Sequence, residues 1–268
     1  MDRPLVVLAA HVAASAGPPH LVEVAGVRVT GGEIADHFAT LVAPSIAVAP
    51  EATALHGIDD EAVRTAPQAP DALAALLDWL GDDWAAAHEA RTLAGRLGFE
   101  AARHGLALPA SPLVDVRALA SRVLSDAPAH DLRSLADWLE LEADELGRAL
   151  PDAATTWKVL EACVERLGGA ASGAELLARS GLPLSLASGV PGRPRRFPRR
   201  LRPLERACAS GEPVTLIYGD DEHEAPARLP VRPRLLYELG DHGYLEAECG
   251  LSGTLKTYRL DRVARVEA

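Results

Sequence analysis

The sequence is poor in sulfur-containing and aromatic residues. Its 268 residues include one methionine and three cysteines, and Phe, Trp and Tyr together make up 4%. Cys163, Cys208 and Cys249 are widely separated, odd in number and not arranged as a CxxC pair, which argues against a disulfide framework and against a cysteine-ligated zinc site. This cysteine usage fits a reducing compartment, so we expect a cytoplasmic protein.

Positive charge is scarce as well, with 27 basic residues against 38 acidic ones and a formal net charge of −11. A chain with this balance does not coat nucleic acid through its overall field, so any contact with nucleic acid must be local. No stretch approaches the roughly 18 consecutive apolar residues of a membrane span, so no membrane partner is predicted. The short apolar run near the N-terminus is interpreted as a first strand and not as an export signal.

What the chain does contain is enough apolar sequence, 48% of its residues, for the cores of two domains. Residues 5–10 form a continuous apolar run that is typical of a central strand buried on both faces. Residues 21–29 (LVEVAGVRV) turn at Gly31 and Gly32 into residues 33–44 (EIADHFATLVAP), a pattern that predicts a β-hairpin. The order of strand and helix patterns up to about residue 167 predicts an α/β sheet flanked by helices.

A loop stiffened by Pro44 and Pro50 follows the hairpin, and Asp59 or Asp60 is expected to cap a helix that begins near Glu61. The run LVEVAGVRV, FATLVAP and PEATALHGIDDEAV resembles the DnaQ-like (DEDDh) 3′-to-5′ exonucleases, which have a ribonuclease H-like fold. The resemblance covers about 40 contiguous residues and continues more weakly to about residue 167. It implies a mixed sheet with flanking helices.

This resemblance implies a two-metal site, which needs carboxylate ligands and a base for the attacking water. Ala9 and His11 stand where the family has Asp and Glu on its first strand, and Leu93 stands where it has Asp in a middle helix. Gly147 replaces the family's His, so of five positions only Asp152 is kept. The site is therefore expected to be degenerate and to hold no cofactor. Mg²⁺ or Mn²⁺ would be needed only if the chain is an active exonuclease.

Other candidate residues each allow a simpler interpretation. His11, Glu89 and Asp152 could converge on one softer metal such as Mn²⁺ or Zn²⁺, or His11 could face a vacated cleft while Glu89 is a solvated helix-terminal residue. His56 and Gly57 resemble the family's loop beside the terminal nucleotide and are predicted to contact nucleic acid, with loop packing as the alternative.

Residues 170–199 are predicted to be a linker that ends in a basic arm, with six arginines between positions 193 and 202. Guanidinium groups bind phosphate bidentately, so the arm is expected to contact nucleic acid. The alternative is a solvated linker that balances an acidic protein. The predicted contacts are Arg195, Arg196, Arg199 and Arg200.

Residues 200–268 contain a helix pattern ending at Gly211 and then five short alternating runs, which predict a small barrel or curled sheet. GEPVTLIY, GYLEAEC and YRLDRV resemble the WYL domain, an Sm- or SH3-like β-barrel, although Gly243 stands where that family has its tryptophan. The resemblance implies that Tyr244, Arg259 and Arg262 recognise a nucleic acid or nucleotide-like ligand.

The chain is thus expected to comprise a DnaQ-like exonuclease-fold domain (1–169), a linker with a basic arm (170–199) and a WYL-like β-barrel (200–268). The favoured hypothesis is a protein that binds single-stranded nucleic acid or senses a nucleotide-like ligand, in DNA repair or defence, without nuclease turnover. Turnover is not expected because Gly147 replaces the family's His, and loss of a general base alone typically costs 10²–10⁴-fold in rate. The alternatives are an active metal-dependent 3′-to-5′ exonuclease with a relocated or partner-completed site, and a subunit that docks a protein partner.

Overall fold

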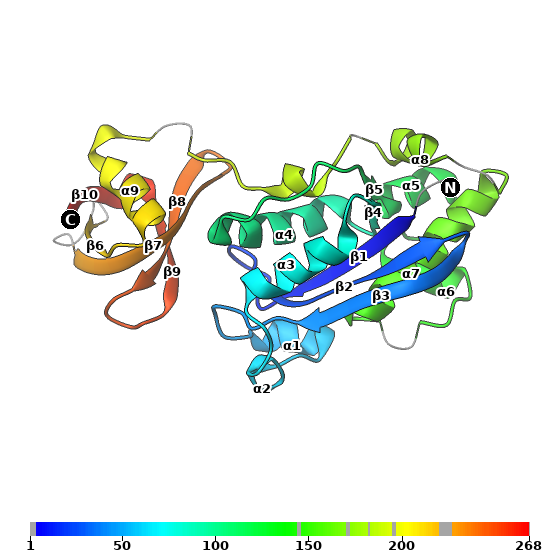
Figure 1. Ribbon diagram of the computed structural model, residues 1–268, viewed down its shortest axis with the longest axis horizontal. Coiled ribbons are helices and arrows are strands. Elements are labelled where there is room, and N and C mark those ends of the chain that lie inside the picture. Colours follow the sequence, from blue (N-terminus) through cyan, green and yellow to red (C-terminus); the bar gives the residue numbers. More distant parts are fainter. Residues whose placement is uncertain are drawn as a thin grey trace. The chain divides into compact units, whose positions relative to one another are not determined.

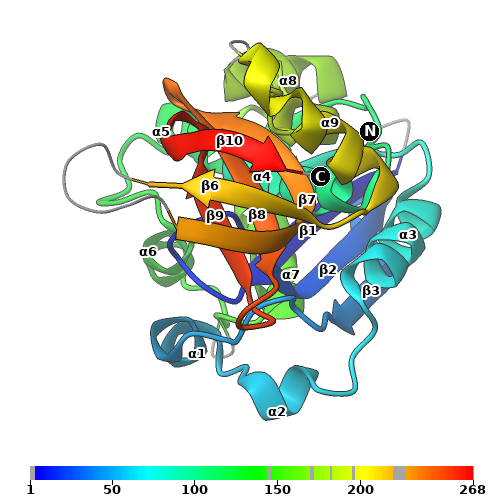
Figure 2. The ribbon, with the colours of Figure 1, turned by 90° about the vertical axis from the view of Figure 1, so that its left-hand side faces the viewer.

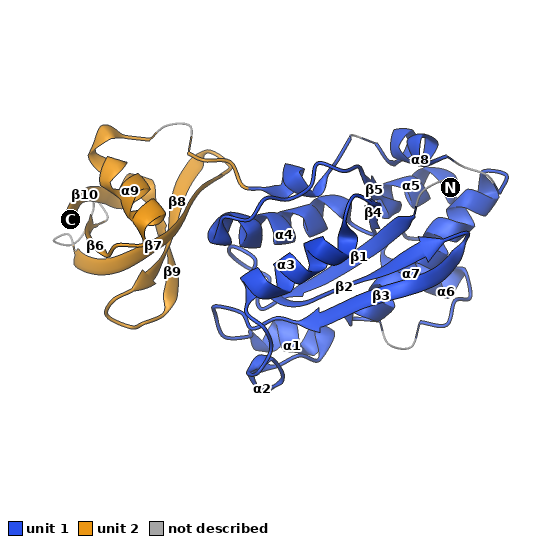
Figure 3. Cartoon of the chain, in the orientation of Figure 1, with its two compact units in different colours: residues 1–190 blue, residues 191–268 orange. Residues whose placement is uncertain are grey.

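The computed structural model describes residues 4–143, 146–169, 172–181, 183–194, 197–219 and 227–267. The chain forms two compact units, residues 1–190 and residues 191–268 (Figure 3). The division at residue 190 falls inside the segment predicted to be a linker, and the predicted boundaries at residues 169 and 199 stay a prediction. Arg195 and Arg196 of the basic arm lie outside the described residues.

Unit 1 is built on a mixed five-stranded sheet in the order β3-β2-β1-β4-β5 (Figure 1). The first three strands are antiparallel neighbours, and β4 and β5 continue the sheet in parallel. The predicted central strand and the hairpin that turns at two glycines are therefore confirmed. The strands are β1 (Leu5–Val12), β2 (Leu21–Thr30), β3 (Glu33–Leu41), β4 (Trp84–Ala87) and β5 (Leu113–Asp115).

Helices cover both faces of this sheet, which explains why β1 is apolar from Leu5 to Ala10. Val6 and Leu8 pack with the first group of helices, α3 and α4, while Leu5 and Val7 pack with the second group, α5, α7 and α8. No helix in the described parts of the chain is long and apolar enough to cross a membrane. The helices of unit 1 are α1 (Pro50–His56), α2 (Asp60–Val63), α3 (Ala69–Leu80), α4 (Ala90–His104), α5 (Val116–Val123), α6 (Leu132–Trp138), α7 (Ala149–Arg166) and α8 (Gly173–Ser180).

The predicted aspartate cap of α2 is confirmed. The Asp59 carboxylate accepts from the Ala62 N–H at 2.8 Å and starts α2, and Asp115 accepts from the Ala118 N–H at 2.8 Å and starts α5 in the same way. The predicted loop before α2 contains the short helix α1, for which Pro50 is favourable because its fixed φ suits the first helical turn.

The segment after α8 returns to unit 1. Its short 3₁₀ helix η1 (Leu186–Gly189) packs on α4, and the carbonyl of Leu184 accepts from the Leu113 N–H of β5 at 2.8 Å. The approach to α4 requires glycine, since a Cβ on Gly189 would lie 1.9 Å from the carbonyl oxygen of Ala94. Backbone contact of this kind, and not composition, places residues 183–190 with the first unit.

Unit 2 is an antiparallel five-stranded sheet in the order β10-β6-β7-β8-β9, with one helix packed against it (Figure 2). The five predicted strands are confirmed, and together with the mixed sheet of unit 1 they bear out the expected fold class. The elements are η2 (Arg199–Leu201), α9 (Arg202–Ser210), β6 (Val214–Tyr218), β7 (Ala227–Leu239), β8 (His242–Cys249), β9 (Leu255–Arg259), η3 (Leu260–Arg262) and β10 (Val263–Glu267).

Candidate functional site

A cavity of about 150 Å³ opens in unit 1 beside β1 and β4, between the start of α4 and α7. Four of the five positions that the exonuclease resemblance singled out line it, namely Ala9, His11, Leu93 and Asp152. The fifth, Gly147, lies next to it through a hydrogen bond to Asp152. The fold therefore brings together positions that are as far as 143 residues apart in the chain.

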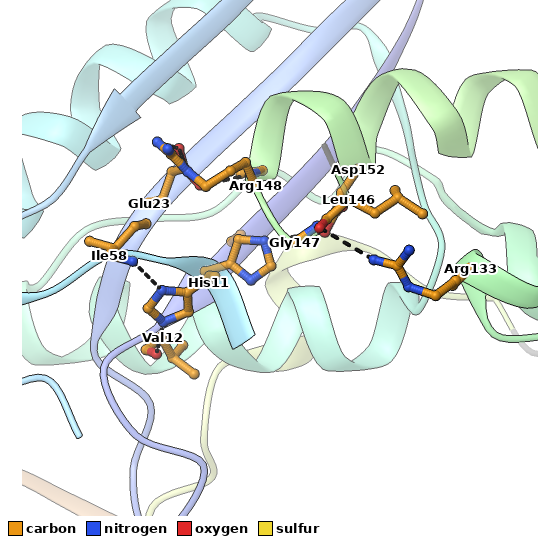
Figure 4. Close-up of polar contacts among 12 residues, drawn as sticks. His11, Val12, Glu23, Ile58, Arg133, Leu146, Gly147, Arg148 and Asp152 are labelled. Carbon is orange, nitrogen blue, oxygen red and sulfur yellow. Dashed lines mark hydrogen bonds and ion pairs between the residues drawn. The ribbon is translucent and has the colours of Figure 1, made fainter. Parts of the chain in front are cut away.

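Asp152 is held by contacts within the protein (Figure 4). One carboxylate oxygen accepts from the Gly147 N–H at 2.9 Å, and the other lies 3.2 Å from His11 Nε2. The second pair is close enough for an ion pair when the imidazole is protonated, although its geometry is not that of a hydrogen bond. Both side chains are largely buried, at 17% and 18% exposure. The remaining carboxylate of the family pattern is thus surrounded by protein groups.

Arg96, on α4, lines the same cavity and was not predicted to belong to the site. Its guanidinium donates to the carbonyl oxygen of Ala10, on the strand between two of the predicted positions. Burial lowers the pKa of Arg96, and the charges of Glu89 and Asp152 act in the opposite direction. An arginine keeps its proton at any physiological pH. The cavity therefore contains a fixed positive charge close to Asp152.

A second buried contact sets the position of α7. Glu23, on β2 and opposite His11 in the strand register, is 5% exposed. Its carboxylate accepts from Arg148 Nη2 at 2.6 Å and Nε at 3.1 Å, and also from the Ala149 N–H at 2.7 Å, the first residue of α7. A carboxylate at a helix N-terminus also interacts favourably with the helix dipole. Glu23 thereby fixes the helix that carries Asp152.

Gly147 cannot carry the family's histidine in this backbone. Its φ of +109° lies in the region that disfavours any side chain, and a Cβ would stand 2.7 Å from the carbonyl oxygen of Leu55. The end of α1 therefore occupies the space into which a side chain at position 147 would point. A histidine at position 147 would therefore require the backbone before α7 or the end of α1 to move.

His56 and Gly57 close α1 beside this site. The His56 ring centroid lies 5.5 Å from that of His11; its Nδ1 accepts from the Ile58 N–H at 3.1 Å, and its Nε2 lies 3.3 Å from the carbonyl oxygen of Val12. Burial lowers the pKa of His56, which favours the neutral ring. Gly57 ends the helix with φ +72°. Both nitrogens of His56 have partners within unit 1, one in the loop and one at the end of β1, and its contact with nucleic acid stays a prediction.

The residues of the cavity do not fit the metal centre that the resemblance implies. In the part of the chain that the structure describes, no group of three or more His, Cys, Asp or Glu could hold a metal ion. Glu89 does line the cavity together with His11 and Asp152, but its carboxylate forms an ion pair with Arg117. We therefore assign no metal to this arrangement.

In unit 2 the predicted ligand residues Tyr244 and Arg259 face each other on β8 and β9. The Tyr244 ring stacks on Tyr237 with centroids 5.4 Å apart, and Arg259 Nε donates to Asp261 at 3.1 Å. Arg262 follows in η3.

Gly243 is accommodated where the WYL family has tryptophan. A Cβ at this position would lie 2.9 Å from a methyl group of Leu260 and 3.4 Å from Pro194. The side chains of Leu260 and Pro194 therefore pack against the backbone at position 243 and occupy space that a larger side chain would need.

The end of the predicted basic arm belongs to unit 2. Phe197 packs against the core of that unit, Arg199 and Arg200 form η2, and the Arg200 Nε–H donates to the Val263 carbonyl oxygen at 3.3 Å. These two arginines are therefore anchored to a folded element. Their role in nucleic-acid binding, like that of the other predicted site residues, stays a prediction.

Solved structures define the class of fold. Exonuclease X in complex with 5′ overhanging duplex DNA aligns with a TM-score of 0.54 and 21% identity, over 66% of this chain and 99% of that one. Exonuclease I aligns with a TM-score of 0.55 and 11% identity, over 99% of this chain and 64% of that one. At these identities the likeness shows the ribonuclease H-like exonuclease fold and no more.

Residues 12–160 match the family described as Exonuclease, and residues 199–268 match the WYL domain. The first match covers more than half of the chain, so the chain belongs to this exonuclease family. Both resemblances noted in the sequence are confirmed.

Curated relatives share the first unit. A Mycobacterium tuberculosis (strain CDC 1551 / Oshkosh) protein named as a bifunctional exonuclease/endonuclease is 36% identical over 153 residues, 56% of this chain and 24% of that protein. A PolC-type DNA polymerase III of Oceanobacillus iheyensis is 33% identical over 150 residues, 54% of this chain and 10% of the polymerase. The chain thus spans a quarter or less of these relatives' lengths.

Proposed function

We propose that the cavity of unit 1 binds the end of a nucleic-acid strand without a metal ion and without cleaving it. The observation that carries this proposal is the environment of Asp152. Its carboxylate accepts the Gly147 N–H and faces His11, so its charge interacts with protein groups. A site for two divalent cations needs several free carboxylate oxygens.

The electrostatics of the cavity support binding without metal. A cluster of carboxylates repels phosphate until bound cations neutralise it. Here Ala9, Leu93 and Gly147 are uncharged, Glu89 is paired with Arg117, and Arg96 adds a fixed positive charge to the cavity that Asp152 lines. A terminal phosphate therefore meets much less repulsion than in a site with four carboxylates, and Arg96 attracts it.

The same changes argue against turnover. Hydrolysis of a phosphodiester by two metals needs the metals to generate the nucleophile and a base to take its proton. Position 147 offers no base, and a lost base alone costs about 10²–10⁴-fold in rate. We therefore propose a non-catalytic protein, placed in DNA repair or defence in the cytoplasm, in which the WYL unit adds a ligand contact through Tyr244, Arg259 and Arg262.

The test uses the full chain and a short single-stranded DNA labelled at its 5′ end. We expect binding, measured by fluorescence anisotropy, that is equal in Mg²⁺, Mn²⁺ and EDTA, and no shortening of the strand on a denaturing gel. Arg96→Gln should weaken binding. Arg179→Gln is the control, because it removes an exposed arginine of unit 1 that pairs with Glu175 and does not line the cavity.

The outcomes separate the alternatives. Shortening of the strand that requires metal and is abolished by Asp152→Ala would establish an active exonuclease and overturn this proposal. Absence of binding in every condition would also overturn it, and the protein-docking alternative would then be tested next. Binding that Arg96→Gln and Arg179→Gln weaken equally would place the contact outside the cavity.

A further inference from the structure

The helical segment that opens unit 2 has two chemically different faces. Arg199, Arg202 and Arg206 are all exposed and are spaced by three and four residues along η2 and α9, so their side chains lie on one face. The helix α9 lies against β7 (Figure 1). The opposite face contributes three buried residues to the core of unit 2, Leu201, Leu204 and Ala207.

These three arginines differ from the exposed arginines on the strands of the unit. Arg234 pairs with Glu248 at 3.0 Å, and the guanidinium groups of Arg228 and Arg265 both pair with Glu267. By contrast, the guanidinium groups of Arg199, Arg202 and Arg206 have neither an ion pair nor a hydrogen bond with any described residue. Three like charges on one face are mutually repulsive, so this face is electrostatically unsatisfied in a chain whose net charge is −11.

The spacing suits a polyphosphate backbone. The seven steps from Arg199 to Arg206 rise about 2.0 Å each in the 3₁₀ helix and about 1.5 Å each in the α-helix, and together span about 12 Å. A DNA strand carries one phosphate per about 3.4 Å of duplex axis, so this length faces about three phosphates. Arginine is suited to such contacts because its planar guanidinium binds phosphate bidentately.

The face lacks the features of a protein interface. Interfaces between proteins are built around buried apolar or aromatic side chains. The exposed large apolar residues in the described chain all lie elsewhere, at Ile34, Leu55, Val190, Leu239 and Leu251.

We propose that Arg199, Arg202 and Arg206 form a phosphate-binding face that contacts the sugar-phosphate backbone of a nucleic acid. This inference rests on the proposed nucleic-acid function but concerns a different site, in unit 2 and not in the cavity of unit 1. Contacts to phosphate carry no base information, so this face should add affinity equally for strands of different sequence.

The test compares two triple variants of the full chain that change the net charge equally. The first is Arg199→Gln with Arg202→Gln and Arg206→Gln, which removes the unpaired arginines. The control is Arg228→Gln with Arg234→Gln and Arg265→Gln, which removes paired arginines exposed at 65%, 46% and 67%. Binding of a short labelled single-stranded DNA is measured by anisotropy over a range of salt concentrations, and circular dichroism checks that each variant is folded.

The first variant should bind roughly 10- to 100-fold more weakly at about 0.1 M salt, and the slope of log affinity against log salt should fall by about 2, since each single-strand phosphate contact contributes about 0.7. The control should keep the wild-type slope. A variant with lysine at the same three positions should recover most of the slope, because it restores the charges.

Equal weakening by the two triple variants would show an effect of net charge alone and would overturn the inference, as would wild-type affinity in the first variant. Displacement of the DNA by polyglutamate as readily as by unlabelled DNA would assign the face to acidic proteins instead. If Arg96→Gln weakens binding and the first triple variant does not, only this inference fails. The reverse result leaves it standing and removes the cavity from the proposed function. No binding by the wild type overturns both.

Discussion

The charged residues near the cavity of unit 1 and those on the outer face of α9 are arranged in opposite ways. In unit 1 these charged side chains have partners within the protein. Glu23 accepts from Arg148 and from the backbone at the start of α7, and Asp152 accepts from the Gly147 N–H. On η2 and α9, Arg202 and Arg206 point to solvent. Charges satisfied inside the protein fix its shape, whereas exposed charges without partners are available to a ligand.

The largest effect on stability is expected at Gly147, whose N–H is the backbone partner of Asp152. Gly147→His should destabilise unit 1 by about 3 kcal/mol or more, because it combines a strained backbone conformation with a clash in a packed site. The measurement is urea unfolding followed by tryptophan fluorescence, which reports unit 1 because all four tryptophans, at positions 79, 84, 138 and 157, lie there.

Gly105→His is the matched control for this change. Gly105 also has a positive φ, +67°, but no atom lies within 4 Å of a Cβ built on it. It should lose only the conformational contribution, about 1 kcal/mol. Equal losses at the two positions would show that the contact with Leu55 does not restrict position 147.

The next largest loss of stability is expected for the buried carboxylate of Glu23. Glu23→Gln should lower the free energy of unfolding by about 2–3 kcal/mol, because a buried carboxylate with several charge-assisted hydrogen bonds is replaced by a neutral amide that cannot accept all of them. The same fluorescence measurement applies. Glu161→Gln, which removes an exposed i,i+3 partner of Lys158, should change stability by less than about 0.5 kcal/mol. A small effect at Glu23 would mean that the cap of α7 does not depend on it.

The buried histidines predict a pH dependence of unit 1. Burial lowers the pKa values of His56 and His88 below the ordinary value of 6.5. The unfolded chain then binds more protons than the folded one below about pH 6.5, so stability is full above that pH and falls as the pH drops towards the folded pKa values. The midpoint of urea unfolding should therefore decrease from about pH 7.5 to about pH 5.5.

His56→Gln combined with His88→Gln should flatten this dependence, since glutamine does not titrate. An unchanged slope in the double variant would assign the pH dependence to other groups. Glu100 affects the pH dependence of stability only at more acidic pH. Burial acts to raise the pKa of its carboxyl, but the hydrogen bond from His104 and the charge of Arg103 outweigh burial and lower it, so the stabilisation by Glu100 is lost only as the pH falls below the usual range of a glutamate.

The smallest effect is expected for the paired arginines on the surface of unit 2. Arg234→Gln should change the unfolding free energy by less than about 0.5 kcal/mol, because Arg234 and Glu248 are both about half exposed and solvent screens their attraction. Far-UV circular dichroism during urea unfolding measures this change. A cost comparable to that of Glu23→Gln would contradict the distinction between inward and outward charges.

Much of the cavity could be predicted from the sequence, because the resemblance carried the spacing of Ala9, His11, Leu93 and Asp152 onto a fold that places those positions together. Arg96 and Glu23 could not be predicted in the same way. Glu23 and Arg148 are separated by 125 residues, and their contact depends on how α7 packs against β2. The one available signal was a glutamate within an apolar strand pattern, since a buried carboxylate needs a partner.

The sequence by itself determined the strands, the aspartate cap of α2, the two kinds of domain and the identity of the residues at the five family positions, since periodicity, turn residues and local hydrogen bonding are encoded over short stretches. Only the tertiary structure decided what those residues contact. It placed Arg96 beside Asp152 and brought the backbone of Leu55 against Gly147. Such contacts join distant segments, and their geometry follows from the packing of whole elements, which no local pattern specifies.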